Sequence, residues 1–288
     1  MPCYQAPAKI NLGLRVGPRD TRGFHPIDTV MQTVAMKDWL TLEPHDHLTW
    51  STTGDPVAVT MDDNNLVVRA YHWCRGLKPQ LPPVNGHLHK VIWTGAGLGG
   101  GSSDAAAVIR WAFEGDAVLT SPEFHQRASV LGMDVPFFLV GGTVRAEGYG
   151  EHLTPIFGIP QRAVVLANPG FSLSTAAVYA AFDADDGVKP LPPIEDTLEC
   201  LRSGEAVPRE MLANDLEDAA FRVEPALRSF RDVIQSAADG APFALSGSGP
   251  TYYILGSDDE WAGWMARRLH ARGIPRVYPT TTLDRGSQ

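Results

Sequence analysis

Two periodicities in the order of apolar and polar residues predict the strands and helices of this chain. Alternation of apolar and polar residues between polar turns is typical of strands. It occurs at residues 8–16, and strands are also expected at residues 30–42, 47–51, 87–93, 141–147, 151–155 and 277–283. The continuous apolar run at residues 163–168 predicts a buried strand, and residues 243–255 have the pattern of a hairpin. Apolar residues three or four positions apart predict helices. These are residues 64–76, 104–113, 122–131, 174–182, 211–236 with an interruption at Pro225, and 261–272.

The mixture of these elements predicts the fold class. Strands and helices follow one another without strict alternation, which favours an α+β arrangement in layers. At 288 residues the chain is long enough for two modest domains. We expect an N-terminal domain at residues 1–157 and a C-terminal domain at residues 158–288. Residues 183–193 are rich in Asp and Pro, so a loop is expected there.

Composition and charge exclude several classes of protein. The formal net charge of −9 argues against nucleic acid as a partner, because duplex binding needs a broad basic face. No apolar run reaches the roughly 18 residues of a membrane span, and the first residues lack the layout of a secretory signal. Cys3, Cys74 and Cys200 are too scattered for a disulfide framework or a zinc site. We therefore expect a cytoplasmic protein, whose oligomeric state the sequence leaves open.

The segment that follows Trp93 carries the strongest chemical signal. Its sequence, Gly95-Ala96-Gly97-Leu98-Gly99-Gly100-Gly101-Ser102-Ser103-Asp104, contains five glycines and two serines and precedes an alanine-rich helix. A backbone without Cβ atoms can wrap closely around a ligand. A helix start adds unpaired N–H groups and the positive end of a dipole. The combination predicts a site for phosphate oxygens.

This glycine segment has three alternative interpretations. It would be a structural turn if Ser102 or Ser103 only caps the next helix. Three of its glycines match the G-x-G-x-x-G of dinucleotide-binding folds, but the match lies far into the chain and no acid-bearing strand follows it. The common ATPase loop needs a lysine before the serine, and the segment has none. The pattern favours a phosphate-binding loop of another design, with its lysine supplied from elsewhere.

A carboxylate and a lysine are candidates for the catalytic groups. Phosphoryl transfer needs cationic help for the developing charge and a group that places or deprotonates the acceptor hydroxyl. Asp134 lies among apolar residues at the start of a predicted short helix, where it is either a base or a helix N-cap. Lys9 lies in a predicted strand, where it points either to solvent or inward to an anion.

Three motifs, taken together, resemble the signature motifs of the GHMP kinases, which include galactokinase and homoserine, mevalonate and phosphomevalonate kinases. They are Pro7-Ala8-Lys9-Ile10-Asn11-Leu12, the glycine segment, and Ser246-Gly247-Ser248-Gly249-Pro250-Thr251, in the order of that family. Within the superfamily, Gly23-Phe24-His25 with Asp134-Val135-Pro136 resembles the 4-diphosphocytidyl-2-C-methyl-D-erythritol kinases. The resemblance extends over about residues 6–255.

The resemblance implies a fold and an activity. The fold is the α+β, two-domain GHMP kinase fold. It has an N-terminal mixed sheet with helices on one side, a C-terminal α/β sandwich, and the active site in the cleft between them. The activity is ATP-dependent phosphorylation of the 2-hydroxyl of 4-diphosphocytidyl-2-C-methyl-D-erythritol, a step of non-mevalonate isoprenoid precursor biosynthesis. The alternatives are a GHMP kinase of mevalonate or homoserine type and a catalytically inactive, nucleotide-sensing relative.

The resemblance also implies roles for single residues. Asp134 would be the general base, and Lys9 would lie beside it and keep the carboxylate ionised. The expected ATP-binding residues are Trp93, Thr94, Gly95, Ala96, Gly97, Leu98, Gly99, Gly100, Gly101, Ser102 and Ser103. The expected substrate-binding residues are Asn11, Phe24, His25, Thr175 and Tyr179, with the cytosine between the rings of Phe24 and Tyr179. Mg²⁺ is expected with ATP, without assigned ligands.

Three positions depart from the pattern of the family. Trp93 stands where proline is usual, Arg22 where aspartate is common, and Pro26 where an acidic residue is frequent. The segment before Gly23 is one residue longer than usual. None of these changes removes a proposed catalytic group.

Overall fold

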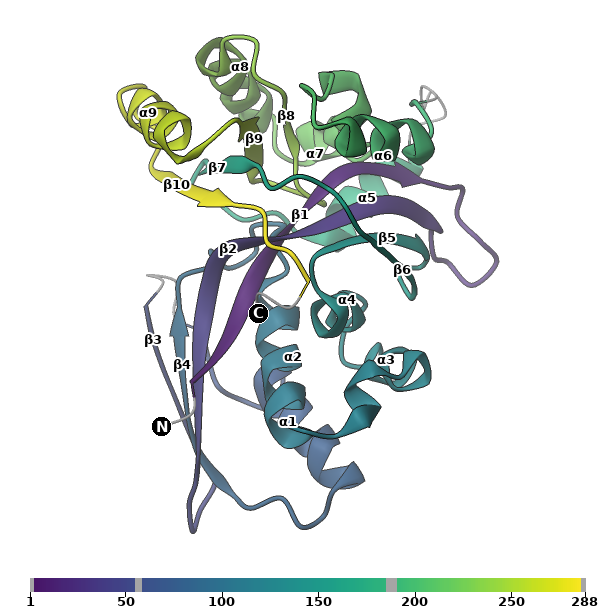
Figure 1. The fold of residues 1–288 in the computed structure, drawn as a ribbon, viewed down its shortest axis with the longest axis vertical. Helices are drawn as coiled ribbons and strands as arrows, with labels where there is room; N and C mark the ends of the chain where they lie inside the picture. Colours follow the sequence, from purple (N-terminus) through teal and green to yellow (C-terminus); the bar gives the residue numbers. More distant parts are fainter. Residues whose placement is uncertain (1–2, 55–58, 185–190, 286–288) are drawn as a thin grey trace.

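The chain builds two β-sheets, which a computed structural model describes over residues 3–54, 59–184 and 191–285 (Figure 1). The first sheet has the order β3-β4-β2-β5-β6, and β1 pairs with β2. Its strands are β1 (Cys3–Val16), β2 (Ile27–Pro44), β3 (Thr49–Gly54), β4 (Val84–Lys90), β5 (Thr143–Gly148) and β6 (His152–Ile156). The β3–β4 pair is parallel and the other pairs are antiparallel, so the sheet is mixed.

Helices cover one face of this first sheet (Figure 1). They are α1 (Leu66–Leu77), α2 (Gly100–Ala112), the 3-10 turn η1 (Ala117–Thr120), α3 (Pro122–Ala128) and α4 (Val135–Val140). The five consecutive residues 105–109 of α2 are fully buried. Three of them are alanines, whose small side chains let α1 and the first sheet approach the helix closely.

The second sheet is antiparallel and has the order β10-β7-β9-β8. Its strands are β7 (Ala163–Asn168), β8 (Phe243–Leu245), β9 (Tyr252–Gly256) and β10 (Arg276–Thr281). α8 (Ala226–Ala238) and α9 (Asp259–His270) pack on this sheet through their apolar stripes. Pro225, where the sequence predicts an interruption, is the N-cap of α8.

The remaining helices lie where the two sheets meet. They are α5 (Thr175–Asp183), α6 (Ile194–Ser203), the 3-10 turn η2 (Arg209–Leu212) and α7 (Glu217–Val223). α6 lies over the long β1–β2 hairpin (Figure 1). One apolar cluster contains Leu201 of α6 together with Ile10 of the first sheet and Tyr253 of the second. Both sheets therefore share a core.

The expected domain boundary lies in the connection between β6 and β7. β6, of the first sheet, ends at Ile156, and β7, of the second sheet, begins at Ala163. The end of the chain nevertheless returns to the first sheet, where the N–H of Leu283 donates to the Thr33 carbonyl at 2.8 Å. Together with the shared core, this contact ties the two halves together.

Local chemistry explains where the sequence-based boundaries are wrong. The expected strand 87–93 ends at Lys90, because the Asp38 carboxylate takes the N–H groups of Val91 and Ile92. α2 begins at Gly100, four residues before the predicted start. α6 was not predicted, because its stripe of Ile194, Leu198 and Leu201 is separated by charged residues. Of the expected loop 183–193, residues 185–190 lie outside the described residues.

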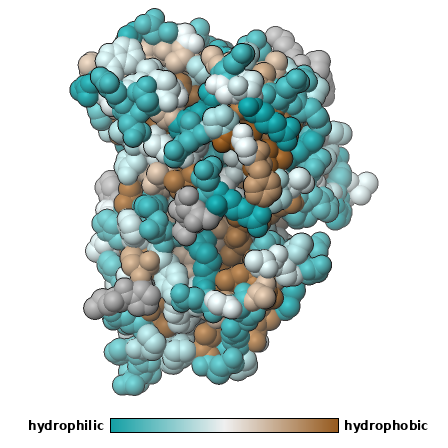
Figure 2. Space-filling view, viewed as in Figure 1, coloured by the Kyte–Doolittle hydropathy of each residue, from teal (hydrophilic) through white to brown (hydrophobic). Residues whose placement is uncertain are grey.

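The face of the molecule drawn in Figure 2 is mostly polar. Teal, hydrophilic residues cover most of the face in Figure 2, and brown, hydrophobic residues come to the surface chiefly near its middle. Within the described residues, no helix has the length and apolar character needed to cross a membrane.

Replacement of Leu201 tests whether α6 belongs to the shared core. Leu201 is fully buried, so we expect Leu201→Ala to lower the free energy of unfolding by about 2–5 kcal/mol in urea titrations. Glu199→Ala, on the exposed face of the same helix, is the matched control and should change it by less than about 0.5 kcal/mol. Equal effects of the two substitutions would show that α6 is not packed as described.

Candidate active site

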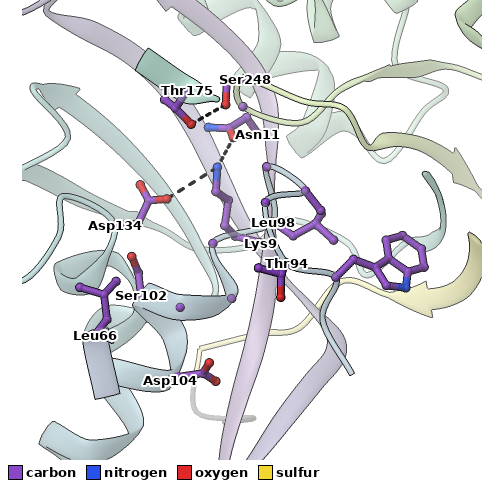
Figure 3. Close-up of a pocket in the computed structure, with 18 of the residues that line it drawn as sticks. Lys9, Asn11, Leu66, Thr94, Leu98, Ser102, Asp104, Asp134, Thr175 and Ser248 are labelled. Atoms are coloured by element: carbon purple, nitrogen blue, oxygen red, sulfur yellow. Dashed lines mark hydrogen bonds and ion pairs between the residues drawn. The ribbon is translucent and has the colours of Figure 1, made fainter. Parts of the chain in front are cut away.

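A cavity of about 420 Å³ opens where the two halves of the chain meet (Figure 3). That volume is in the range of small-molecule sites. The first half of the chain contributes Lys9, Asn11, Asn65, Leu66, Lys90, residues 93–102, Asp104 and Asp134 to its lining. The second half contributes Thr175, Tyr179, Leu216, Gly247 and Ser248. Most of the expected ATP-binding residues are thus in one wall, and both expected catalytic residues face the same space.

The glycine segment forms the N-terminal turn of α2. Gly99 is the N-cap of this helix and has left-handed backbone angles, with φ 71° and ψ 15°. The interpretation in which Ser102 or Ser103 caps the helix is therefore wrong. A Cβ atom at Gly97 would lie 2.3 Å from the Ser246 carbonyl oxygen, so only glycine fits there. Gly100, Gly101 and Ser102, the first residues of α2, line the cavity, so the positive end of the helix dipole lies beside it, which favours an anion.

The two serines of this segment have different environments. Ser102 lines the cavity, and its side chain lies on the cavity side of α2 (Figure 3). Ser103 is fully buried, and its Oγ finds no hydrogen-bond partner among the described residues. Of the two hydroxyls, only that of Ser102 is placed to meet a ligand in the cavity.

Lys9 points inward from β1. Its N–H donates to the Leu98 carbonyl at 2.9 Å, so the strand and the glycine segment are joined at this residue. Its Nζ donates to Asn11 Oδ1 at 2.6 Å and lies 3.9 Å from Asp134 Oδ2. Burial lowers the pKa of the Lys9 ammonium, and the charge of Asp134 opposes that shift.

Asp134 occupies the N-cap position of α4 without capping it. Its backbone is helical, and its side chain accepts no capping hydrogen bond from a described residue. The carboxylate instead points toward Lys9 (Figure 3). The interpretation of Asp134 as a helix cap alone is therefore wrong. Burial, with the charge of Asp134, raises the pKa of the Tyr179 hydroxyl to about 12.

The third motif closes the cavity from the second sheet. It is the turn between β8 and β9, and Ser246 Oγ in it donates to the Gly97 carbonyl at 3.0 Å. Ser248 Oγ lies 2.8 Å from Thr175 Oγ1, which joins the turn to α5. A Cβ atom at Gly247 would lie 3.2 Å from Lys9 Nζ, so the ammonium reaches this turn. The three sequence motifs therefore meet around Lys9.

Phe24 and His25 lie outside the lining of the cavity, in the loop before β2. The Phe24 side chain is 60% exposed, and its ring has an edge contact with Tyr149 at 6.1 Å between centroids. The His25 ring lies against Tyr179 at 5.4 Å. Both ring nitrogens of His25 already face oxygens of the chain, Nδ1 the Gly17 carbonyl at 2.9 Å and Nε2 the Asp183 carboxylate at 2.8 Å. Hydrogen bonding of His25 to the edge of the nucleobase, as expected from the sequence, has to be compatible with both of these contacts.

Sequence reasoning missed a buried charge cluster beneath the glycine segment. Lys90 Nζ donates to Asp38 Oδ2 and, at 2.7 Å, to Asp104 Oδ2. Asp104 Oδ1 is buried without a hydrogen-bond partner among the described residues. Burial raises the pKa of the Asp104 carboxyl to about 8. The charge of Lys90 opposes this shift, and the charge of Asp38 adds to it. The available signal was the presence of three charged residues at positions where the pattern is otherwise apolar.

Comparison with known proteins identifies the family. The family model of the GHMP kinases N terminal domain matches residues 65–142. A 4-diphosphocytidyl-2-C-methyl-D-erythritol kinase of Caulobacter vibrioides (strain NA1000 / CB15N) is 38% identical over 275 residues, covering 92% of this chain and 93% of the relative. The chain belongs to the 4-diphosphocytidyl-2-C-methyl-D-erythritol kinase family.

Two further relatives of this family agree over nearly the whole length. A kinase of the same name from Moorella thermoacetica is 35% identical and covers 99% of this chain and 98% of the relative. A crystal structure of a 4-(cytidine 5'-diphospho)-2C-methyl-D-erythritol kinase superposes with a TM-score of 0.79 at 34% identity, covering 98% of this chain and 99% of that one. The GHMP kinase fold predicted from the motifs is therefore confirmed.

The buried cluster predicts a pH dependence of stability. Because the pKa of Asp104 is raised on folding, the native protein holds this proton more tightly than the unfolded chain does. The stabilisation that this proton gives to the native protein is fully present below pH 3.8, and it is lost as the pH rises through about 8. We expect Asp104→Asn to flatten that fall in the free energy of unfolding, measured by urea titration across this range.

The matched control for Asp104→Asn is Asp218→Asn, at an exposed carboxylate in the first turn of α7. This variant should show the same dependence of the free energy of unfolding on pH as the parent protein. A parent protein whose stability rises over the same pH range would contradict the assignment of a raised pKa to Asp104.

Proposed function

We propose that the protein transfers the γ-phosphoryl group of ATP to the 2-hydroxyl of 4-diphosphocytidyl-2-C-methyl-D-erythritol, with ADP as the other product. Family membership supports a kinase of this kind. The observation that carries the proposal is the meeting of Lys9 and Asp134 at 3.9 Å in the cavity that the glycine segment lines. A carboxylate, an ammonium and an anion-binding helix start are the parts that phosphoryl transfer needs.

The wall formed by the glycine segment is proposed to bind ATP. The N–H groups at the start of α2 would hold the phosphates, and Trp93 and Thr94 would line the approach to them. Mg²⁺ usually keeps several waters and binds through phosphates and one or two protein oxygens. The Ser102 hydroxyl is exposed to the cavity, so it fits such a site as a single ligand. Mg²⁺ bound there would neutralise charge on the phosphates.

The opposite wall is proposed to bind the acceptor. Asn11 and Thr175 line the cavity with polar side chains that suit a diphosphate or a polyol. Tyr179 lines the same space, and the exposed Phe24 is next in the chain to His25, whose ring packs on Tyr179. Two aromatic rings would stack on the cytosine, at roughly 1–3 kcal/mol per stacking contact.

The proposed chemistry assigns one task to each catalytic residue. The 2-hydroxyl oxygen attacks the γ-phosphorus while its proton passes to a carboxylate oxygen of Asp134, and the bond to the β,γ-bridging oxygen breaks to release ADP. Lys9 lies too far from Asp134 for a direct hydrogen bond, so its ammonium is free to stabilise charge on the acceptor oxygen. Asn11 accepts from Lys9 and fixes its direction.

The wider setting is also a proposal. We infer that the partner is a small molecule, because the described site is a cavity lined by polar side chains and glycines. Cys3, Cys74 and Cys200 are free thiols, which suits the reducing cytoplasm expected from the sequence.

A direct assay tests the activity. Pure protein with ATP, magnesium and 4-diphosphocytidyl-2-C-methyl-D-erythritol should yield the 2-phosphate and ADP in equal amounts, measured by phosphorus NMR. Mevalonate and homoserine serve as competing acceptors and should give no product. Turnover of either of these in place of the cytidyl substrate would contradict the proposal.

Replacement of the proposed base separates catalysis from binding. Asp134→Asn removes the proton acceptor but keeps the shape of the side chain, so kcat should fall by at least ~10²-fold. The affinity for an ATP analogue, measured by calorimetry, should change by less than about 3-fold, because the glycine segment is untouched. A variant with normal turnover would show that Asp134 is not the base.

A further inference from the structure

The carboxylate of Asp183 joins the two walls at the proposed nucleobase end of the site. Asp183 is the last residue of α5. Its Oδ1 lies 2.8 Å from His25 Nε2, and its Oδ2 lies 3.4 Å from Arg19 Nη1. Both partners belong to residues 17–26, which we call the nucleobase loop. One carboxylate therefore connects a helix of the second half of the chain to a loop of the first.

The nucleobase loop is held firmly at its other end. Asp20 Oδ1 accepts the N–H groups of Arg22 at 2.9 Å and Phe24 at 3.0 Å, and Oδ2 accepts the Tyr149 hydroxyl at 2.6 Å. Arg22, a departure from the family pattern, lies over the Tyr149 ring at 4.6 Å. These contacts fix the backbone that presents Phe24. They do not fix its distance from α5.

Asp183 acts on the side of α5 that faces the site. Tyr179 precedes it by four residues, and residues with this spacing share one face of a helix. The His25 ring packs on Tyr179 and, edge-on at 5.6 Å, on Phe182. The contact from Asp183 to His25 thus sets how closely the nucleobase loop approaches the helix that carries Tyr179.

This contact differs from an ordinary surface ion pair. Exposed ion pairs contribute little, and the Arg19 partner is of that kind, with 58% of its side chain exposed. The His25 side chain is only 6% exposed, and the Asp183 side chain 28%. The Gly17 carbonyl lies 2.9 Å from the other ring nitrogen, so the His25 ring has an oxygen close to each of its nitrogens. Nε2 makes no hydrogen bond to a described residue, so the contact with Asp183 is a close approach of Nε2 to the carboxylate.

We propose that Asp183 is a positioning residue that sets the width of the nucleobase slot by holding His25 of the nucleobase loop against α5. The inference rests on the proposed function, because it assigns this slot to the cytidine end of the acceptor. Asp183 touches neither reacting group, so it acts on the affinity for the acceptor and leaves the phosphoryl transfer step unchanged.

The test compares three variants by calorimetry with CDP and by steady-state kinetics. Asp183→Ala removes the carboxylate, and we expect the Kd for CDP and the KM for the cytidyl substrate to rise about 10-fold. Asp183→Asn keeps a side-chain oxygen that can contact His25, so both constants should rise less than about 3-fold. Asp218→Ala, at an exposed ion pair on α7, is the matched control and should equal the parent protein.

Two readouts distinguish positioning from a structural role. In Asp183→Ala, kcat and the KM for ATP should stay within about 2-fold of the parent protein. When Asp183→Ala is combined with His25→Gln, the fold increase in the Kd for CDP should be clearly less than the product of the two single increases. Both substitutions break the same contact, so their effects should not multiply. Two outcomes would overturn the proposal. One is that the effects of Asp183→Ala and His25→Gln multiply in the double variant. The other is that Asp183→Ala lowers kcat and raises both KM values by similar factors.

The same data separate this inference from the proposed function. A parent protein that binds CDP but gives no 2-phosphate contradicts the reaction, while the CDP affinities still decide the role of Asp183. A parent protein that turns over normally, with unchanged constants in Asp183→Ala, contradicts the positioning role alone. A parent protein that neither binds CDP nor forms the 2-phosphate contradicts both the proposed function and the role of Asp183.

Discussion

The buried ammonium of Lys9 is the interaction on which the site depends. A charged group in a strand between two packed layers is costly unless an anion and hydrogen bonds meet it. Asn11 and Asp134 supply these at 2.6 and 3.9 Å, and the turn at Gly247 approaches from the second sheet. Because the partners come from β1, α4 and the β8–β9 turn, satisfying one lysine brings three distant segments together. In the proposed reaction, an acceptor hydroxyl meets a phosphate at this place.

A second buried cation supports the first from below. Lys90, with Asp38 and Asp104, ties β4, β2 and α2 together under the glycine segment. Asp38 also takes two backbone N–H groups just after β4, which ends the strand and releases the chain into the loop. The ion pairs of Lys90 hold the end of the loop that follows β4, and the close backbone approach at Gly97 holds the glycine segment against the β8–β9 turn. This rigidity suits a site that orients phosphates before the reaction begins.

Sequence reasoning succeeded where chemistry is local and failed where it depends on packing. Glycines in sequence predict a close backbone approach, and a carboxylate before Val-Pro predicts a helix start, so the glycine segment and Asp134 were found. The inward direction of Lys9 and the pairing of Lys90 depend on what covers each strand, which no local pattern states. α6 was missed because its stripe is short and interrupted by charge, although Leu201 is fully buried. The contacts of His25 likewise come from α5, far along the chain.

The shared core explains why these long-range contacts hold with precision. Residues of β1, α6 and β9 pack in one cluster, so the first and second sheets cannot shift separately without opening apolar surface to water. The cavity lies along the same seam, with the glycine segment on one side and α5 on the other. The core therefore sets the spacing of these two sides. At the nucleobase loop, outside that core, we propose that the contact from Asp183 to His25 sets the spacing.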